Sequence, residues 1–455
     1  MQSREELLGN EKITKLMMQM AIPSVIAQII NILYSIIDRM YIGHIPHVGT
    51  DSLTGIGLTF PIITFISAFS AFVGTGGAPL SAIALGKGDR DHAEKILGNG
   101  VFLLTAFTAL LMGFFYAFQK PLLYMFGASD ATYPYASTYI SIYLIGTLFV
   151  LVSLGLNPYI ISQGQPKIAM FSVLIGAIVN IVLDPIFIFV FGWGVRGAAL
   201  ATIISQALSA LWVVAFLVGK KSTLKIKLSQ CRPHARTLMS ICALGVSPFV
   251  MRSTESLISI VLNRGLQIYG GDLYVGSLTV LQSVMQLISA PISGFTQGVQ
   301  PIISYNYGAM KFDRVKETYR KMISICFVFS FVATLSTILF PNMFAAMFTN
   351  DEALISLVNQ KMPIFMCGML LFGLQMGVQP TFISLGQAKV SLFIALLRKV
   401  ILLVPLALVL PCFYGVQGVY IAEPISDITS AVVATSLFAF QIKKVLNEES
   451  LNKVS

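Results

Sequence analysis

Long apolar stretches recur from one end of this 455-residue chain to the other, and this pattern limits its fold more than any other feature. Each stretch is long enough for a helix to cross a bilayer core about 30 Å thick. Only 11% of the residues are charged, whereas soluble domains carry roughly 25%. The sequence therefore predicts an all-α polytopic protein that crosses a membrane many times.

We predict twelve transmembrane helices, six in each half of the chain. Those of the first half begin near Ile13, Leu53, Ala93, Pro134, Lys167 and Val195, and those of the second near Leu238, Leu273, Val315, Ile355, Lys389 and Val416. Most of the 30 Lys and Arg residues then fall in loops on the side of both termini. The positive-inside rule places that side, with both termini, in the cytoplasm. We interpret the net charge of +10 as a signal of orientation and expect no nucleic-acid partner.

The second half of the sequence repeats motifs of the first half at one nearly constant spacing, which indicates a duplication. Pro79, Gly86, Pro158, Gly164 and Lys167 recur as Pro301, Gly308, Pro380, Gly386 and Lys389. Because each half has an even number of spans, both halves enter the membrane from the same side and form parallel repeats. We predict a lobe over residues 1–222, a basic cytoplasmic linker over 223–236 and a second lobe over 237–455. Two such lobes suit transport by alternating access.

Polar residues inside the predicted spans are the best candidates for function, because a carboxylate in the membrane is costly and usually faces a cavity or a partner. Asp38 and Asp184 lie late in spans that run outward, and Asn31 and Asn180 precede them on the same helix faces. Thr202 lies at a similar depth in a span that runs inward. We expect Asp38, Asn180, Asp184 and Thr202 to form an oxygen-rich cluster that holds a proton or Na⁺, with Asn31 as a cavity candidate.

Structural alternatives stay open for both acids. Asp38 precedes Arg39, which could be its ion-pair partner, and Asp184 precedes Pro185, where it could cap a kinked helix. Pro23 lies in the same span as Asp38. A proline inside a helix frees a carbonyl group and kinks the helix, so Pro23 is a candidate hinge for the motion of the lobes.

The second half carries further charges within its spans. Glu255 follows Arg252 by three residues, a spacing at which the two could form a local salt bridge. Glu423 shares a helix face with Asp427 and aligns with Thr202 in the repeat. Glu255 and Glu423 are therefore candidates for the cavity wall, and the sequence leaves open which of them faces the cavity.

Arg398 and Lys399 in the eleventh span could line the cavity or reach lipid headgroups. No GxxxxGK[ST] phosphate loop occurs in the sequence, so an ion gradient rather than ATP is the expected energy source. The five cysteines lack the spacing of metal ligands or redox pairs. We therefore expect a protein that is not an enzyme and has no cofactor, with H⁺ or Na⁺ as its coupling ion.

Several of these motifs resemble those of the MATE (multidrug and toxic compound extrusion) family. The segments are 38–43 (DRMYIG), 76–88 in span 2, 157–170 before and into span 5, 180–187 (NIVLDPIF) and 194–199 (GVRGAA). The resemblance extends over essentially the whole chain and is closest to the MepA-like bacterial branch, which implies a location in a bacterial plasma (inner) membrane. The resemblance implies two six-helix lobes in a V and an antiporter of drugs and organic cations.

The resemblance also implies roles for individual residues. Asp38 and Asp184 match the coupling-ion acids of the first lobe, and Asn180 and Thr202 lie beside them in the family. The position of Ala198 supplies a backbone carbonyl group to a Na⁺ site. These implied roles agree with the cluster expected from the residues themselves.

Three further positions match the family pattern. Asn157 matches a polar position, Pro23 matches a kinking proline, and Glu255 approximates the carboxylate of members that couple through the second lobe. The leading hypothesis is export of small amphipathic organic cations, in exchange for H⁺ or Na⁺, by a monomer surrounded by membrane lipids. A flippase for lipid-linked saccharides is the first alternative and favours a cationic cavity. A membrane receptor or scaffold without transport is the second. The sequence leaves the coupling ion, the substrate and the oligomeric state open.

Overall fold

The computed structural model describes residues 4–45, 52, 55–348 and 351–446, and no strand occurs among these residues. The first half forms α1 (Arg4–Asn10), α2 (Ile13–Gly43), α4 (Phe60–Gly86), α5 (Arg90–Met125), α6 (Tyr133–Ile145), α7 (Thr147–Ser162), α8 (Pro166–Pro185), the π-helical turn η1 (Ile186–Val190) and α9 (Gly194–Val218). After the short turn η2 (Leu228–Gln230), the second half forms α10 (Ala235–Gly270), α11 (Asp272–Gly308), α12 (Phe312–Leu339), α13 (Pro341–Ala346), α14 (Glu352–Met366), α15 (Met369–Ser384), α16 (Ala388–Leu396), the π-helical turn η3 (Leu397–Leu403), α17 (Val404–Tyr414) and α18 (Val416–Val445).

Within the described residues, nine helical segments are long and apolar enough to cross a membrane. Two bent pairs pass the same test when each is counted as one span: α6 with α7, bent by 59°, and α14 with α15, bent by 47°. The remaining predicted span is α10, a helix of 36 residues that Arg252 and Glu255 make more polar. The prediction of an all-α protein with twelve spans is confirmed, and the helices begin close to the predicted positions.

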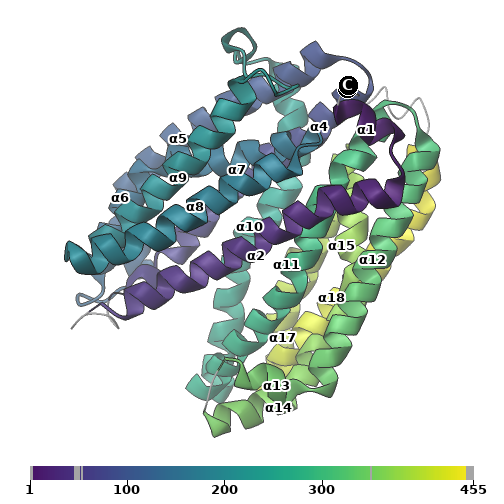
Figure 1. Ribbon diagram of the computed structural model, residues 1–455. Coiled ribbons are helices and arrows are strands. Elements are labelled where there is room, and N and C mark those ends of the chain that lie inside the picture. The colour runs from purple at the N-terminus through teal and green to yellow at the C-terminus, as the bar shows by residue number, and fades with distance from the viewer. Residues whose placement is uncertain (1–3, 46–51, 53–54, 349–350, 447–455) are drawn as a thin grey trace.

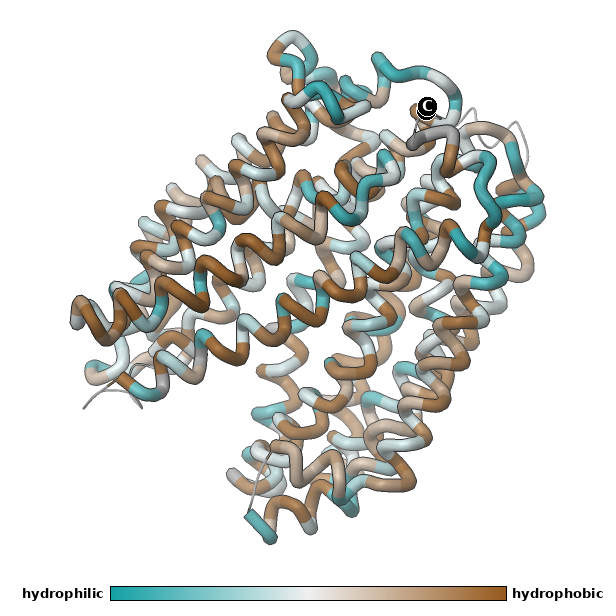
Figure 2. The backbone as a smooth tube through the Cα atoms, viewed as in Figure 1, coloured by the Kyte–Doolittle hydropathy of each residue, from teal (hydrophilic) through white to brown (hydrophobic). Residues whose placement is uncertain are grey.

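The two halves of the chain form two lobes arranged as a V (Figure 1). They meet at the end of the molecule that carries α1 and the last described residues, and they diverge toward the opposite end. Figure 2 shows hydrophobic residues along the lengths of the helices and hydrophilic residues chiefly near the helix ends. Large hydrophobic side chains such as Leu110, Val332 and Phe440 are exposed on the outside, as expected for helices that face lipid.

Equivalent glycines bend equivalent helices in the two lobes. Gly146 separates α6 from α7, and Gly368 separates α14 from α15. A Cβ atom at Gly146 would lie 2.7 Å from the side chain of Ile203 in α9, and one at Gly368 would lie 2.7 Å from Pro424 in α18. Because α9 and α18 are themselves equivalent, the duplication in the sequence reappears as a repeated helix bend and a repeated close contact.

Glycines also bring the two lobes together at the closed end of the V. Gly245 of α10 packs on the backbone of Phe72 in α4, and a Cβ atom at Gly76 would lie 2.7 Å from a carbonyl oxygen of α10. In α11, a Cβ atom at either Gly294 or Gly298 would lie within 2.7 Å of the backbone of α2. Small residues let helix backbones approach this closely in membranes. We call these contacts the glycine seam, and they hold the closed end of the V together.

Candidate functional site

A cavity of about 1090 Å³ lies between the lobes. The predicted cavity residues Asn31 and Asn157 both line it, together with Gln28 and Gln297, whose side chains hydrogen-bond across the seam at 3.2 Å. Among the described residues that line this cavity none is Asp or Glu, and Arg252 is the permanently charged one. Within the described residues, the wall of the central cavity is therefore rich in amide and hydroxyl groups and carries one fixed positive charge.

A small pocket of about 30 Å³ extends from this cavity into the first lobe. It shares Asn31, Tyr34 and Asn157 with the cavity wall and reaches Asn180 and Thr202 at its inner end. The Asn157 amide donates to Ser172 Oγ at 2.6 Å and to the Ala169 carbonyl oxygen at 3.1 Å. A pocket of this size with polar walls holds a water molecule or a small ion.

The two predicted acids of the first lobe lie together beside this pocket. The carboxyl groups of Asp38 on α2 and Asp184 on α8 are in hydrogen-bonding contact. Asn180 lies one helical turn before Asp184, and its amide donates to Asp184 Oδ1 at 3.4 Å. Asp184 is fully buried. The α-helix ends directly after it, at Pro185, where the π-helical turn η1 begins. Asp184 therefore lies both at a helix break and beside a second carboxyl group.

Helix α9 adds a hydroxyl group and a carbonyl group to the cluster. Thr202 Oγ1 donates to the Ala198 carbonyl oxygen at 3.0 Å, and the side chain of Tyr139 on α6 hydrogen-bonds with Thr202. Tyr139 also interacts electrostatically with Asp38, and its ring stacks on that of Tyr143 with 6.3 Å between centroids. Sequence reasoning missed Tyr139, because tyrosines at every fourth residue of this helix indicate a shared face but not the contact with Thr202.

Two buried oxygen atoms of the cluster, Asp184 Oδ2 and Asn180 Oδ1, receive no hydrogen bond from a donor in the described part of the chain. Two carboxylates in contact repel each other unless they share a proton or a cation lies with them. Hard cations prefer oxygen ligands, which all members of the cluster supply. The described residues hold no group of three or more His, Cys, Asp or Glu side chains suited to a metal ion. The cluster is therefore a pair of acids supported by amide and hydroxyl oxygens, and the side chain of Arg39 lies outside what the structure describes.

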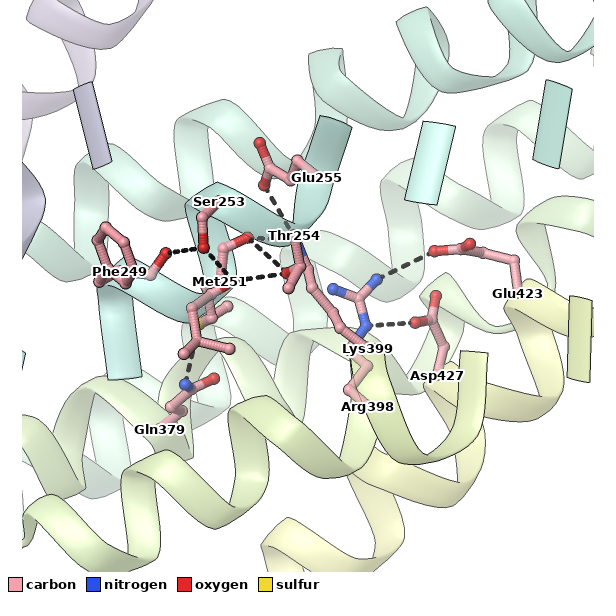
Figure 3. A network of polar contacts seen from close by, with 11 residues as sticks. Phe249, Met251, Ser253, Thr254, Glu255, Gln379, Arg398, Lys399, Glu423 and Asp427 are labelled. Atoms are coloured by element: carbon pink, nitrogen blue, oxygen red, sulfur yellow. Dashed lines mark hydrogen bonds and ion pairs between the residues drawn. The ribbon is translucent and has the colours of Figure 1, made fainter. Parts of the chain in front are cut away.

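The predicted cavity candidate Glu423 lies in a different place, inside the second lobe (Figure 3). Arg398 donates from Nε to Asp427 at 2.6 Å and from Nη2 to Glu423 at 3.3 Å. The guanidinium group also lies over the ring of Phe372, with its carbon atom 4.2 Å from the centroid. None of these residues is among those that line the central cavity. Both carboxylates are instead held by a buried arginine.

Glu255 pairs with Lys399 rather than with Arg252. Lys399 Nζ donates to Glu255 Oε1 at 3.2 Å and to the Met251 carbonyl oxygen at 2.7 Å (Figure 3). The side chain of Lys399 is 7% exposed, whereas that of Glu255 is 62% exposed. The alternative of a local Arg252–Glu255 bridge is therefore wrong in this structure, because the Glu255 carboxylate pairs with the buried Lys399 of η3. Arg398 and Lys399 are both buried and are not among the residues that line the central cavity.

Comparison of the sequence with protein-family models assigns the family. The model described as MatE matches residues 23–186 and 249–409, one segment in each lobe. The two segments together cover more than half of the chain. The chain belongs to the MatE family. This confirms the resemblance seen in the motifs, and membership of a transporter family agrees with the prediction that the protein is not an enzyme.

Curated relatives of this MatE transporter are named as multidrug export proteins. The chain is 26% identical over 449 residues to Multidrug export protein MepA of Staphylococcus haemolyticus, a match that covers 97% of this chain and 96% of the relative. It is 25% identical over 437 residues to Multidrug export protein MepA of Staphylococcus aureus, with coverage of 96% and 94%. The similarity thus extends over nearly the full length of both lobes.

Solved MATE structures share the fold of this MatE transporter. One is described as the outward-facing conformation of a multidrug resistance MATE family transporter and matches with a TM-score of 0.89 at 22% identity, over 98% of this chain and 99% of that one. Another is a MOP superfamily transporter from Pyrococcus furiosus, described as having a binding pocket of reverse polarity. It matches with a TM-score of 0.90 at 22% identity and the same coverage.

The predicted hinge of this MatE transporter, Pro23, lies inside α2, which continues without a break from Ile13 to Gly43. The residues on either side of Pro23 contribute to the glycine seam. Gly298 of α11 packs on Met20 and Ala21, and Gly294 packs on Ser24 and Val25. Pro23 therefore lies where α2 crosses between the lobes, and its role as a hinge stays a prediction.

Proposed function

We propose that this MatE transporter is an antiporter that exports amphipathic organic cations in exchange for H⁺ or Na⁺. The observation that carries the proposal is the contact between the carboxyl groups of Asp38 and Asp184, beside a pocket that adjoins the central cavity. An ion at this acid pair and an organic cation in the cavity are attracted by the same negative charge. If the ion weakens the binding of the organic cation, and the organic cation that of the ion, then the transport of one is coupled to the transport of the other.

The wall of the cavity restricts where an organic cation can bind. Arg252 lies on the wall of the second lobe and repels a cation there. Tyr34 and Tyr143 lie on the wall of the first lobe, and the faces of aromatic rings attract cations. We therefore place the organic cation on the first-lobe side, next to the acid pair. The similarity to proteins named for multidrug export supports this class of substrate.

Alternating access supplies the mechanism in this proposal. With the basic, termini-bearing side in the cytoplasm, the cavity opens outward and the glycine seam closes the cytoplasmic side. An ion that enters from outside neutralises the acid pair and releases the organic cation. The lobes then rock about the seam, the cavity opens to the cytoplasm, and the ion leaves as a new cation binds.

Arg252 is the observation that favours a flippase for lipid-linked saccharides as the second candidate, because a cation in the cavity could bind a pyrophosphate group. However, Arg398 and Lys399 are engaged by acids of the second lobe. That leaves Arg252 as the fixed positive charge on the described cavity wall. Export of organic cations is the better supported function.

The proposal is tested in liposomes that contain the purified chain and a fluorescent organic cation, with either a pH gradient or a Na⁺ gradient across the membrane. We expect one gradient, or both, to drive efflux of the dye. Asp184→Asn should reduce this efflux to the level of liposomes without protein. The control is Asp130→Asn, since Asp130 is an exposed acid of the same lobe that contacts Tyr124 at 3.1 Å, outside the cluster. Equal efflux by wild type and Asp184→Asn would contradict the coupling role. If liposomes with the wild-type chain retain the dye under both gradients, a flippase or a scaffold would instead be favoured.

A further inference from the structure

A second cavity, of about 300 Å³, lies at the termini-bearing end of the molecule. It is formed by the end of α4, the turn that follows it, the start of α5 and the start of α10. Its inner wall is apolar and includes Leu80, Ile83 and Ile96. The proposed transport mechanism does not use this cavity, which shares no lining residue with the central one.

The mouth of this cavity is strongly basic. Its basic lining residues are Lys87, His92, Lys95, His234 and Arg236. In the described structure neither Lys95 nor Arg236 forms an ion pair with an acidic side chain.

The acidic residue at the mouth, Asp89, does not neutralise Lys95 or Arg236. Asp89 caps α5 by accepting a hydrogen bond from the His92 backbone at 2.9 Å, so its carboxylate is directed at the helix end. The nearby Glu94 is buried and paired with Arg90 and Lys227. Lys95 and Arg236 thus have no acidic ion-pair partner in the described part of the chain.

The cavity spans both lobes, because α4 and α5 belong to the first half of the chain and α10 to the second. Ser240 of α10 lines it, and the next residue, Ile241, contributes the carbonyl oxygen against which Gly76 packs in the glycine seam. A molecule in this cavity therefore contacts the two lobes one residue away from the place where they meet.

We propose that this cavity binds an anionic phospholipid of the leaflet on the termini-bearing side. The phosphate group lies between Lys95 and Arg236, and an acyl chain follows the apolar wall of Leu80, Ile83 and Ile96. Basic pockets between transmembrane helices recognise such headgroups, and a basic mouth above an apolar wall matches a lipid better than a free anion. The bound lipid joins the lobes and stabilises the form in which the glycine seam is closed.

The test uses the full chain, purified in detergent, with bound lipid counted by native mass spectrometry. We expect phosphatidylglycerol to bind more tightly than phosphatidylcholine, and Lys95→Gln/Arg236→Gln to weaken phosphatidylglycerol binding about tenfold or more. The matched control is Lys220→Gln/Lys221→Gln, which removes the same charge near the same end of the molecule but outside the cavity lining. The control should stay within about twofold of wild type, and Lys95→Arg/Arg236→Lys should retain binding because the charge remains.

Two results would overturn the proposal. The first is equal loss of phosphatidylglycerol binding in the pocket variant and the control, since that indicates a general effect of charge. The second is competition by inorganic phosphate at concentrations similar to those of the lipid, since the apolar wall would then contribute nothing and the ligand would be a free anion. Thermal unfolding of each variant is recorded in parallel, so that a loss of folding is not mistaken for a loss of binding.

Discussion

Gly86 and Gly308 occupy equivalent positions in the two lobes and make the same contact in opposite directions. A Cβ atom at Gly86 in α4 would overlap the carbonyl oxygen of Tyr305 in α11, and one at Gly308 in α11 would overlap the carbonyl oxygen of Ile83 in α4. Reciprocal contacts of this kind are characteristic of an interface with two-fold symmetry. The axis that relates the lobes therefore passes through the crossing of α4 and α11, at the closed end of the V.

This relationship predicts that Gly308→Leu prevents α4 and α11 from packing together at the closed end of the V. The new side chain must push α4 and α11 apart, at a cost of about 1–3 kcal/mol or more for overpacking. We expect an increase in the distance between spin labels on these two helices and a fall in efflux of at least about tenfold. Gly113→Leu is the matched control, because Gly113 is exposed on α5 and has open space around its Cβ position. Unchanged label distances in Gly308→Leu would show that the crossing tolerates a side chain.

The sequence allowed the lobes and the spans to be predicted from periodic patterns, and the acid pair from the similar depths of Asp38 and Asp184 in spans that run outward. Duplicated motifs kept one register, and Asn180 precedes Asp184 by one helical turn, so their shared face followed from helix geometry. Tyr139 was missed because its contact with Thr202 joins α6 to α9, and no spacing along the chain encodes that contact.

In the second lobe, spacing along the sequence did not identify the partners of the charged residues. A spacing of three residues suggested a local bridge between Arg252 and Glu255, yet the buried Lys399 takes the carboxylate from another helix. A buried cation must be paired, and which acid it finds depends on tertiary packing. Glu423 was a candidate for the cavity wall because it aligns with Thr202, but Arg398 holds it inside the lobe.

Tyr139→Phe should impair coupling without unfolding the protein. The change removes one hydroxyl group that hydrogen-bonds with Thr202, and one such bond contributes about 0.5–1.5 kcal/mol. We expect ion-driven efflux to fall roughly twofold to tenfold. Tyr133→Phe is the control, because Tyr133 lies at the start of the same helix and stacks on Tyr124, away from the central cavity. Efflux assays of both variants at matched protein levels check this, and an equal loss in the two would indicate a general effect of removing a hydroxyl group from α6.

Glu255→Gln should leave ion-driven efflux within about twofold of wild type. Glu255 is 62% exposed and is not among the residues that line the central cavity, and a glutamine at this position still offers a side-chain oxygen to the buried Lys399. Lys399 keeps its hydrogen bond to the Met251 carbonyl oxygen after the change. The measurement is efflux under pH and Na⁺ gradients, with Asp184→Asn as the inactive reference. A loss as large as that of Asp184→Asn would move the coupling site, or part of it, to the second lobe.

Arg398→Met should destabilise the second lobe strongly, because it leaves the buried carboxylates of Glu423 and Asp427 without their shared cation. Breaking a buried pair in this way costs about 3–5 kcal/mol, whereas replacing all partners by neutral groups is often tolerated. We therefore expect a clear drop in the thermal unfolding temperature of Arg398→Met and recovery of most of it in Arg398→Met/Glu423→Gln/Asp427→Asn. If the triple variant also restores efflux, the network has a structural role and ion-coupled transport does not require it. If stability returns but efflux does not, these carboxylates take part in transport.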